Sequence, residues 1–323
     1  MPLLKENHIL GFDEIEVSQK DAKCQLAEKW LEKTATDSEL QVNEDDTQIH
    51  IKGREFAYTI DRRTALFTEM KFAGREYLNH PMELNIWRAP TDNDMYIKAE
   101  WKKAHYDKAY TRAYTTEVVQ GKHGVKIASH ASVVAETVQK ILDVTITWKI
   151  DASGKIDADI EATKDGEFPD LPRFGVRMFL DKKLSDARYF GMGPQESYCD
   201  KHQAASHGLY RADVGDLHED YIRPQENGSH YDCEYVELNN SRYGIVASAE
   251  KAFSFNASYY TQEELEKKTH NYELTESDSV VFCVDYALNG IGSNSCGPVV
   301  LEQYRFDDVL FRFQFTLIPY VKG

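Results

Sequence analysis

The sequence predicts an all-β fold, a large antiparallel sandwich with a few short helices, and three observations support this class. Segments in which apolar and polar residues alternate recur along the chain, as in Ile141–Ile150 and Lys155–Ala162. Alternation with period two is typical of strands that bury one face. Turn-forming residues such as Asp151–Gly154 separate these segments. Helical patterns are rare, and many short strands with few helices indicate a sandwich.

Residues 1–39 differ from the rest of the chain. Ile9–Val17 contains one strand pattern, and the charged stretch that follows has no pattern for a partner strand. A single strand is unstable unless it pairs with another. We therefore predict an N-terminal arm or linker over residues 1–39, whose strand at residues 8–17 completes a sandwich in a partner chain by strand addition. The sandwich domain itself is predicted over residues 40–323.

Two short helices are predicted inside the sandwich domain. Apolar spacing predicts the first over Ile97–Tyr110, with Asp92 and Asp94 as cap candidates. The second is predicted over Thr261–Lys268. Thr261 is its expected N-cap, and a glutamate three positions later would complete a capping box.

The other strand predictions also come from alternation, and they are Arg173–Leu180, Tyr231–Leu238, Tyr243–Ala249, Val280–Tyr286 and Val309–Ile318. In the last of these, Phe311, Phe313 and Phe315 fall on one face because side chains alternate along a strand. We expect that face to belong to the core rather than to a ligand site.

Composition and charge make several classes of function improbable. The chain has 54 acidic against 38 basic residues and a net charge of −16, which repels phosphate backbones and argues against a nucleic-acid partner. It contains no run of about 18 apolar residues and no apolar core near Met1, so neither a membrane span nor a signal peptide is expected. The five cysteines show no CxxC spacing, which fits a reducing cytoplasm rather than disulfides or a zinc site.

The segment Trp87–Asp94, with the sequence Trp-Arg-Ala-Pro-Thr-Asp-Asn-Asp, is the most informative motif. Its proline breaks a strand, and the residues after it fill a loop with side chains that bind oxygen-rich ligands or cap a helix. Arg88 can pair with Asp92 or Asp94 inside the loop. Arg88 and Asn93 can also contact a ligand, but we favour a structural role for this loop at a subunit boundary, near the pocket.

Paired acidic groups were also considered as a catalytic site. Glu196 and Glu226 lie in the near-identical pieces Pro-Gln-Glu-Ser and Pro-Gln-Glu-Asn. Retaining glycoside hydrolysis needs two carboxyl groups about 5–5.5 Å apart. Each glutamate can instead accept backbone N–H bonds within the turn that contains it. We favour this structural interpretation. A sugar-epimerising site needs a general acid and a general base, commonly Glu and His. No spacing singles out such a pair among the histidines His202, His207, His218, His230 and His270.

Five blocks in order resemble the C-terminal domain of the β-galactosidases of glycoside hydrolase family 2. They span about 210 of the 323 residues and comprise Trp87–Asp94, Phe190–Tyr198, Tyr221–Gly228, Phe253–Ser258 and Asp285–Pro298. Residues 8–17 also resemble the last strand of the immunoglobulin-like domain that precedes this domain in the family. The resemblance implies that residues 40–323 form one galactose-mutarotase-like super-sandwich.

The resemblance further implies a small, non-catalytic subunit of a heterodimeric β-galactosidase, which hydrolyses terminal β-D-galactosides such as lactose with retention. A large partner subunit would carry the barrel, both catalytic glutamates and the Mg and Na sites, so no catalytic residue, cofactor or metal is expected here. The substrate-binding residues implied for the pocket rim are Cys296, Asn294, Arg88 and Asn93. Cys296 stands where the family has either Trp or Cys, and a thiol is a weaker stacking platform than an indole. The alternative is a stand-alone carbohydrate-binding or aldose-epimerising sandwich.

Overall fold

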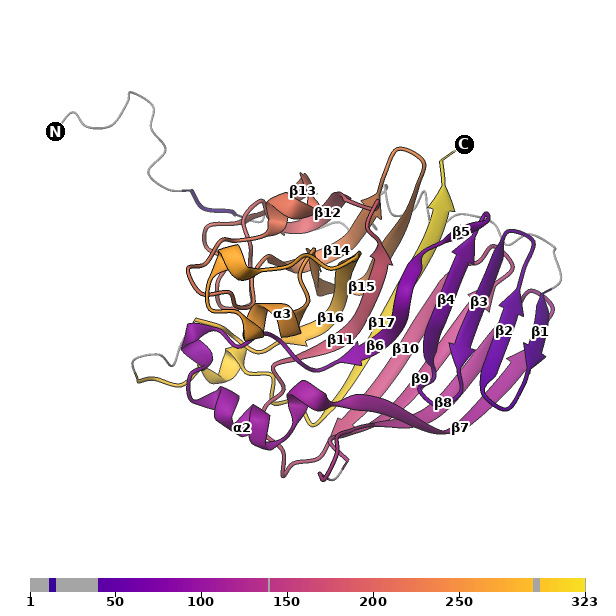
Figure 1. Ribbon diagram of the computed structural model, residues 1–323, viewed down its shortest axis with the longest axis horizontal. Helices are drawn as coiled ribbons and strands as arrows, with labels where there is room; N and C mark the ends of the chain where they lie inside the picture. Colours follow the sequence, from indigo (N-terminus) through magenta and orange to yellow (C-terminus); the bar gives the residue numbers. More distant parts are fainter. Residues whose placement is uncertain (1–11, 16–39, 139, 293–296, 323) are drawn as a thin grey trace.

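The computed structural model describes residues 12–15, 40–138, 140–292 and 297–322, which form two packed β-sheets with short helices at one end (Figure 1). A five-stranded sheet has the order β1-β2-β3-β4-β5. In a twelve-stranded sheet, the path β13-β12-β14-β15-β17-β10-β9-β8-β7 is joined by β16, β11 and β6, which continue side by side from β15. The paired strands are antiparallel. The predicted all-β antiparallel sandwich is confirmed.

The strands of the five-stranded sheet are short and are β1 (Gln41–Glu44), β2 (Gln48–Lys52), β3 (Phe56–Asp61), β4 (Leu66–Phe72) and β5 (Arg75–Glu76). The twelve-stranded sheet contains β6 (Leu78–Asn85), β7 (Tyr110–Gln120), β8 (Gly124–Val134), β9 (Leu142–Asp151), β10 (Ile156–Lys164), β11 (Arg173–Asp181), β12 (Asp186–Gly193), β13 (Ser206–Asp213), β14 (Ser229–Asn239), β15 (Tyr243–Ser258), β16 (Ser279–Leu288) and β17 (Leu310–Val321).

All the strands predicted from alternation within residues 40–323 are present, as β9, β10, β11, β14, β15, β16 and β17. The predicted turn at Asp151–Gly154 joins β9 to β10, and Gly154 has a φ of +85° that favours glycine. Phe311, Phe313 and Phe315 are all buried, so their predicted core face is confirmed. The strands before β9, together with β12 and β13, were not predicted individually.

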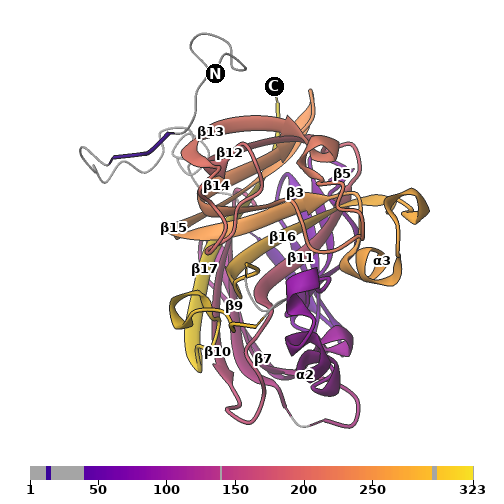
Figure 2. The same cartoon turned by 90° about the vertical axis from the view of Figure 1, so that its left-hand side faces the viewer.

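The core lies between the two sheets, which face each other in Figures 1 and 2. Trp148 on β9 is buried at the centre of this interface, and its ring packs edge-on against Phe67 of β4 at 4.9 Å between centroids. Its indole Nε1 donates to the Ala65 carbonyl at 2.8 Å. Tyr58 of β3 likewise donates to the Gly154 carbonyl at 2.7 Å. Because these buried polar atoms are satisfied across the interface, they fix how the two sheets are oriented.

The first helix is shorter than predicted. α2 covers Ile97–Lys103, a 3-10 turn (η2, Tyr106–Lys108) follows it, and β7 begins at Tyr110. His105 between them adopts a left-handed conformation with φ of 58°, which ends the helix. The prediction that Asp92 and Asp94 cap this helix is wrong, because they belong to a separate 3-10 turn, η1 (Asp92–Asp94).

The second helix, α3 (Gln262–Lys267), lies where it was predicted. The Thr261 hydroxyl accepts a hydrogen bond from the Glu264 backbone N–H at 3.1 Å, so the N-cap is confirmed. The Glu264 carboxylate accepts from the Thr275 backbone N–H at 2.8 Å. The glutamate of the expected capping box therefore fixes the segment after the helix. The remaining short turns are η3 (Val214–Leu217), η4 (Asn271–Glu273) and η5 (Glu302–Tyr304).

The predicted arm lies mostly outside the described residues. Its described part, residues 12–15, is exposed and is not assigned to a strand. The Glu14 carboxylate accepts a hydrogen bond from the His207 backbone N–H at 3.0 Å. His207 lies on β13, the end strand of the larger sheet. Leu40, at the predicted start of the sandwich, is buried in the core, and the boundary between residues 39 and 40 stays a prediction.

Candidate functional site

All five sequence blocks are in contact at the end of the sandwich that carries α2 and α3 (Figure 1), and the Asn256 amide joins the fourth block to the third by donating to the Asn227 carbonyl at 2.6 Å. The Glu226 backbone N–H donates to the Ala89 carbonyl at 3.0 Å, which joins the third block to the octet. The Asp92 backbone N–H donates to the Gln225 side-chain carbonyl at 3.0 Å. The first and last blocks are also joined, because the Arg88 and Asn93 side chains donate to backbone carbonyls of the segment 289–292. This cluster is the candidate functional site.

Arg88 is the buried centre of the cluster, with 0% of its surface exposed. Its guanidinium forms a two-point ion pair with Asp94, with distances of 2.7 Å from Nη2 to Oδ1 and 3.2 Å from Nε to Oδ2. It also donates to the backbone carbonyls of Asn289 and, at 3.2 Å, Gly290. A planar fork with several donors can satisfy a carboxylate and two carbonyls at once, which an ammonium group cannot match. The predicted pairing of Arg88 within its own loop is confirmed, with Asp94 as the partner.

Asp200 and Asn93 hold the next two residues of the same segment. The Asp200 carboxylate accepts from the backbone N–H groups of Ile291 at 3.0 Å and Gly292 at 2.7 Å. The Asn93 amide donates to the Ile291 carbonyl at 2.7 Å. A Cβ atom at position 290 would lie 2.6 Å from Asp200 Oδ2, so the approach requires Gly290. The backbone from 289 to 292 is therefore fixed on both sides by side chains distant in sequence.

The sequence did not single out Asp200. Its signal was present, because it follows the second block by two residues and is acidic, and carboxylates commonly accept backbone N–H bonds in turns. What the pattern could not supply was the partner, which is 91 residues further along the chain.

The four predicted substrate-binding residues have different outcomes. The structure brings Arg88 and Asn93 together on one backbone segment, as described above. Asn294 and Cys296 lie outside the described residues, immediately after the clamped segment in sequence. Arg88 and Asn93 here contact protein groups, and binding of substrate by any of the four stays a prediction.

A small pocket of about 220 Å³ opens beside Asn93. Its lining combines polar and aliphatic side chains and consists of Asn93, Asp94, Ile97, Asp170, Asn289, Val299, Val300 and Arg305. Burial raises the pKa of the Asp170 carboxyl, and the negative charge of Asp307 adds to the shift. The pocket therefore offers a carboxyl, a guanidinium and an amide to a small polar molecule at the edge of the cluster.

Glu226 is buried in an ionic network rather than exposed over a cleft. Arg173 contacts Glu226 at 3.4 Å and Asp285 at 2.8 Å, and all three side chains are buried. Burial raises the pKa of Glu226, and it raises the pKa of Asp285 to about 7 against the opposing effect of Arg173. The expectation that Glu226 accepts backbone N–H bonds is corrected: its carboxylate accepts from the buried Arg173 guanidinium instead. Its burial and its ion pair with Arg173 fit a structural role.

Glu196 also has a structural role. Its carboxylate accepts from the Gly228 backbone N–H at 2.9 Å, as predicted. It also accepts hydrogen bonds from the Lys201 ammonium and the Tyr221 hydroxyl. This network ties the second block to the third, because Glu196 and Gly228 belong to one block each. Both glutamates that could have formed a catalytic pair are thus engaged in holding loops.

The histidines do not assemble a site with a glutamate around the pocket beside Asn93, whose described lining contains no histidine. His230 is buried, and its Nδ1 lies 3.2 Å from the Met192 carbonyl. Burial lowers the pKa of His230 to about 4, so its ring is neutral at pH 7. Burial also lowers the pKa of His218. His202 stacks on Tyr231 with 5.7 Å between ring centroids.

Among the described residues, no group of three or more His, Cys, Asp or Glu side chains is placed to bind a metal ion. The helices of the described part of the chain are too short or too polar to cross a lipid bilayer.

The chain is similar in sequence to one protein family and to several named proteins. The sequence model of the family described as "Beta galactosidase small chain" matches residues 52–317. Proteins named beta-galactosidase from Actinobacillus pleuropneumoniae and Staphylococcus xylosus are 43% identical over 316 residues and 32% identical over 313 residues. These alignments include 98% and 97% of this chain but 30% and 31% of the relatives, so the chain spans about 30% of their length.

A solved structure of galactose 1-epimerase from Lactobacillus acidophilus NCFM is also similar in fold, with a TM-score of 0.44 and 11% sequence identity. The superposition includes 90% of this chain and 100% of that one.

Proposed function

The chain belongs to the β-galactosidase small-chain family, and on this premise we propose that it is the small, non-catalytic subunit of a two-chain enzyme that hydrolyses terminal β-D-galactosides such as lactose. The family membership confirms the resemblance carried by the five sequence blocks. One observation carries the proposal: the chain aligns over almost its whole length with relatives named beta-galactosidase, yet more than two thirds of each relative has no counterpart in it. The missing portion is proposed to be a separate large subunit.

The chemistry is assigned to that partner. Retaining hydrolysis requires a nucleophile and an acid/base carboxyl facing one substrate. In this chain the best candidate pair is engaged elsewhere, since Glu226 is buried against Arg173 and the Glu196 carboxylate accepts hydrogen bonds from four donors. The Mg and Na ions implied by the family are likewise assigned to the partner, with no cofactor on this chain.

The clamped segment 289–292 is proposed to form part of the pocket rim. Arg88, Asn93 and Asp200 fix its backbone, and the residues that follow it include Asn294 and Cys296. A rigid anchor is needed for a loop to present side chains to a substrate held by another chain. In this proposal Asn294 and Cys296 contact the sugar, and the pocket beside Asn93 lies at the edge of the shared site.

Exposed apolar side chains around the cluster fit a subunit interface. Ile222 of the third block is 90% exposed, and Tyr96 and Met95 directly after the octet are also exposed. Val299 and Leu301 flank the last block in the same way. Such side chains on an otherwise charged protein mark contact surfaces. They are proposed to face the large subunit.

The direct test is hydrolysis of a nitrophenyl β-galactoside by the purified chain, by the large subunit and by their mixture. Activity in the mixture that neither subunit has alone is the expected result. Enzyme-like turnover by the isolated chain would contradict the proposal, as would mutarotation of galactose by the chain together with an inactive mixture.

The N-terminal arm is proposed to add a strand to an immunoglobulin-like domain of the partner, since an open sheet edge and a lone strand satisfy each other's backbone groups. Deleting residues 1–20 should weaken co-purification with the large subunit. Unchanged co-purification would refute this part of the proposal.

A further inference from the structure

Five ionisable side chains form a buried network at the candidate site, and this network contains more acids than bases. Arg88 pairs with Asp94, and Arg173 pairs with both Glu226 and Asp285. None of these side chains is more than 5% exposed. If all five were ionised, the network would carry one net negative charge away from water. Because a buried net charge is costly, an acid in such a place commonly takes up a proton.

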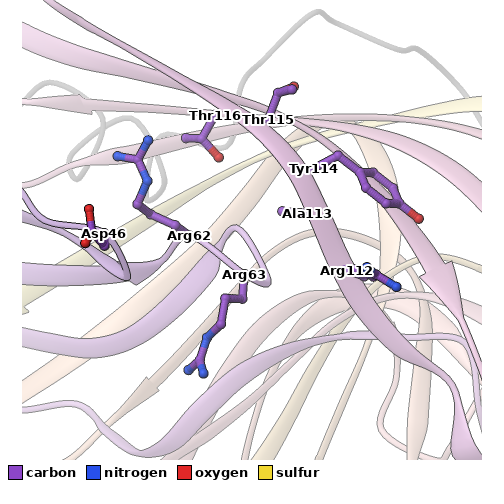
Figure 3. A pocket seen from close by; sticks show the side chains of 8 residues that line it. All are labelled: Asp46, Arg62, Arg63, Arg112, Ala113, Tyr114, Thr115 and Thr116. Carbon is purple, nitrogen blue, oxygen red and sulfur yellow. The ribbon is translucent and has the colours of Figure 1, made fainter.

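Exposed charges carry no such constraint, as the pocket of about 430 Å³ between the turns of the smaller sheet and β7 illustrates (Figure 3). Its lining includes Arg62, Arg63 and Arg112 but one aspartate, Asp46. Arg63, Arg112 and Asp46 are exposed, so water and salt screen the excess of bases there. The buried network lacks this screening.

The groups around the network do not compensate its excess acid. The neighbouring bases each have acids of their own: Lys201 pairs with Glu196, Arg177 pairs with Glu83 and Glu263, and Arg305 shares the pocket beside Asn93 with Asp170. Asp200, which holds the segment 289–292, adds a further acid. Burial, together with nearby acids, raises the pKa of the Tyr198 hydroxyl and of the Cys283 thiol, so both groups are neutral.

Two acids of this region have enough hydrogen-bond donors to stay ionised. The Asp94 carboxylate accepts from four donors, two on Arg88 and two on Thr91. The Glu196 carboxylate, just outside the network, also accepts from four. Hydrogen bonds to the charged form of a carboxyl group stabilise that form. The proton that the network needs is therefore held elsewhere.

Glu226 and Asp285 lack such donors. Each accepts one hydrogen bond, and both bonds come from the guanidinium of Arg173, at 3.4 Å and 2.8 Å. The second oxygen of each carboxyl group, Glu226 Oε1 and Asp285 Oδ1, is buried and has no hydrogen-bond partner among the described residues. Two carboxyl groups that share one positive charge away from water do not both stay ionised. The raised pKa of each group, which burial causes, agrees with this.

We propose that Glu226 and Asp285 share one proton at neutral pH, and that loss of this proton in mild alkali loosens the clamped segment 289–292. The proton leaves two bases facing two ionised acids, so the network is neutral. Its presence is a property of this chain alone. The effect of its loss on catalysis rests on the proposed function, because the clamped segment is assigned to the pocket rim there.

The shared proton is coupled to both sides of the clamp. On one side, the strand that carries Asp285 is β16, which ends at Leu288 directly before the clamped segment. On the other side, the Glu226 backbone N–H donates to the carbonyl of Ala89, which follows Arg88 in the chain. Repulsion between two ionised carboxyl groups therefore acts between the clamped segment and the block that holds it.

Infrared spectroscopy of the purified full chain tests for the proton, since a protonated carboxyl group has a carbonyl stretch that a carboxylate lacks. We expect a wild-type band that is lost as the pH rises from about 6 to about 9. It should be absent from Asp285→Asn and from Glu226→Gln, because each variant has one acid fewer to balance. Asp159→Asn is the control, since Arg312 donates to Asp159 at 2.7 Å and lowers its pKa. This variant should keep the band.

Amide hydrogen exchange tests the effect on the clamped segment. After correction for intrinsic exchange, protection at Ile291 and Gly292 should fall at least about tenfold in wild type over the same pH range. It should stay constant in Asp285→Asn. In mixtures with the large subunit, wild-type kcat/KM for a nitrophenyl galactoside should fall in mild alkali at a lower pH than that of Asp285→Asn.

Three outcomes would overturn the proposal: no such band in wild type, a band that both variants keep, or protection that falls equally in wild type and in the variants. Circular dichroism would verify folding, and Glu226→Gln decides the test if Asp285→Asn does not fold. A mixture that is inactive at every pH would refute the proposed function. The infrared and exchange results on the single chain would still decide whether the proton is present and holds the segment.

Discussion

Replacing Arg88 by methionine is the sharpest test of how the cluster is held. Methionine preserves much of the apolar stem of the arginine but removes all its hydrogen-bond donors. The buried Asp94 carboxylate then keeps hydrogen bonds only from the Thr91 backbone N–H and the Thr91 hydroxyl among the described residues. Breaking a buried ion pair from one side costs about 3–5 kcal/mol of unfolding free energy. For a domain of this size that corresponds to a melting midpoint lower by about 5–8 °C.

The assay is urea unfolding of the purified chain followed by tryptophan fluorescence, since Trp101 lies under the Arg88 guanidinium at 5.2 Å. The double variant Arg88→Met/Asp94→Asn removes the unpaired charge, and its loss should be smaller than the sum of the single losses. The control is Arg211→Met, because Arg211 also forms a two-point pair with an aspartate, Asp186, but on the surface. Its midpoint should stay close to wild type.

A cost below about 1 kcal/mol for Arg88→Met would refute the argument that this pair organises the cluster, since that value is typical of surface pairs. Additive losses in the double variant would also refute it, because they would mean that the two side chains do not depend on each other.

Three further predictions follow from the same structure. Glu226→Gln in the assembled enzyme should lower kcat by less than about tenfold, whereas loss of an acid/base catalyst costs roughly 10²–10⁴-fold, so a loss of that size would place catalysis in this chain. His230→Phe should gain stability relative to wild type by about 3 kcal/mol as the pH falls from 6.5 to about 4. The reason is that the His230 ring takes up a proton in the unfolded wild type near pH 6.5 but in the folded wild type only near pH 4, so acid destabilises the wild type in this window. Parallel profiles of unfolding free energy against pH for the two proteins would contradict this prediction. Asp200→Ala should speed amide hydrogen exchange at Ile291 and Gly292 by about 10–100-fold, since each bond to a charged acceptor contributes about 1.5–3 kcal/mol; unchanged protection in exchange mass spectrometry would show that the clamp is absent.

Local patterns were sufficient where the physical cause is local. Strands β9, β10, β11 and β14 to β17, and the buried phenylalanine face of β17, follow from alternation, since a strand with one buried face must alternate. The β9–β10 turn follows from its turn-forming residues. The N-cap at Thr261 follows from the same kind of short-range rule. The short strands of the smaller sheet were not predicted individually, and they bury their apolar residues only by packing against another sheet.

The first helix illustrates how tertiary contacts override a local pattern. Apolar spacing continues to Tyr110, yet the helix ends at Lys103. Trp101 donates to the Asp170 carbonyl at 2.8 Å, and Tyr106 donates to the Pro169 carbonyl at 2.7 Å. Both aromatic side chains thus reach one distant segment, and the left-handed residue between them permits this arrangement.

By itself, the sequence determined the all-β class and the family through its ordered blocks, and it limited the loop partner of Arg88 to Asp92 or Asp94. Only the tertiary structure decided that Arg88 also holds carbonyls about 200 residues further on, that Asp200 closes the clamp, and that Glu226 is neutralised by Arg173. The physical reason is the range of the interactions. Alternation, caps and turns depend on neighbours in the chain, whereas the partners of a buried charge are set by which strands the fold brings together.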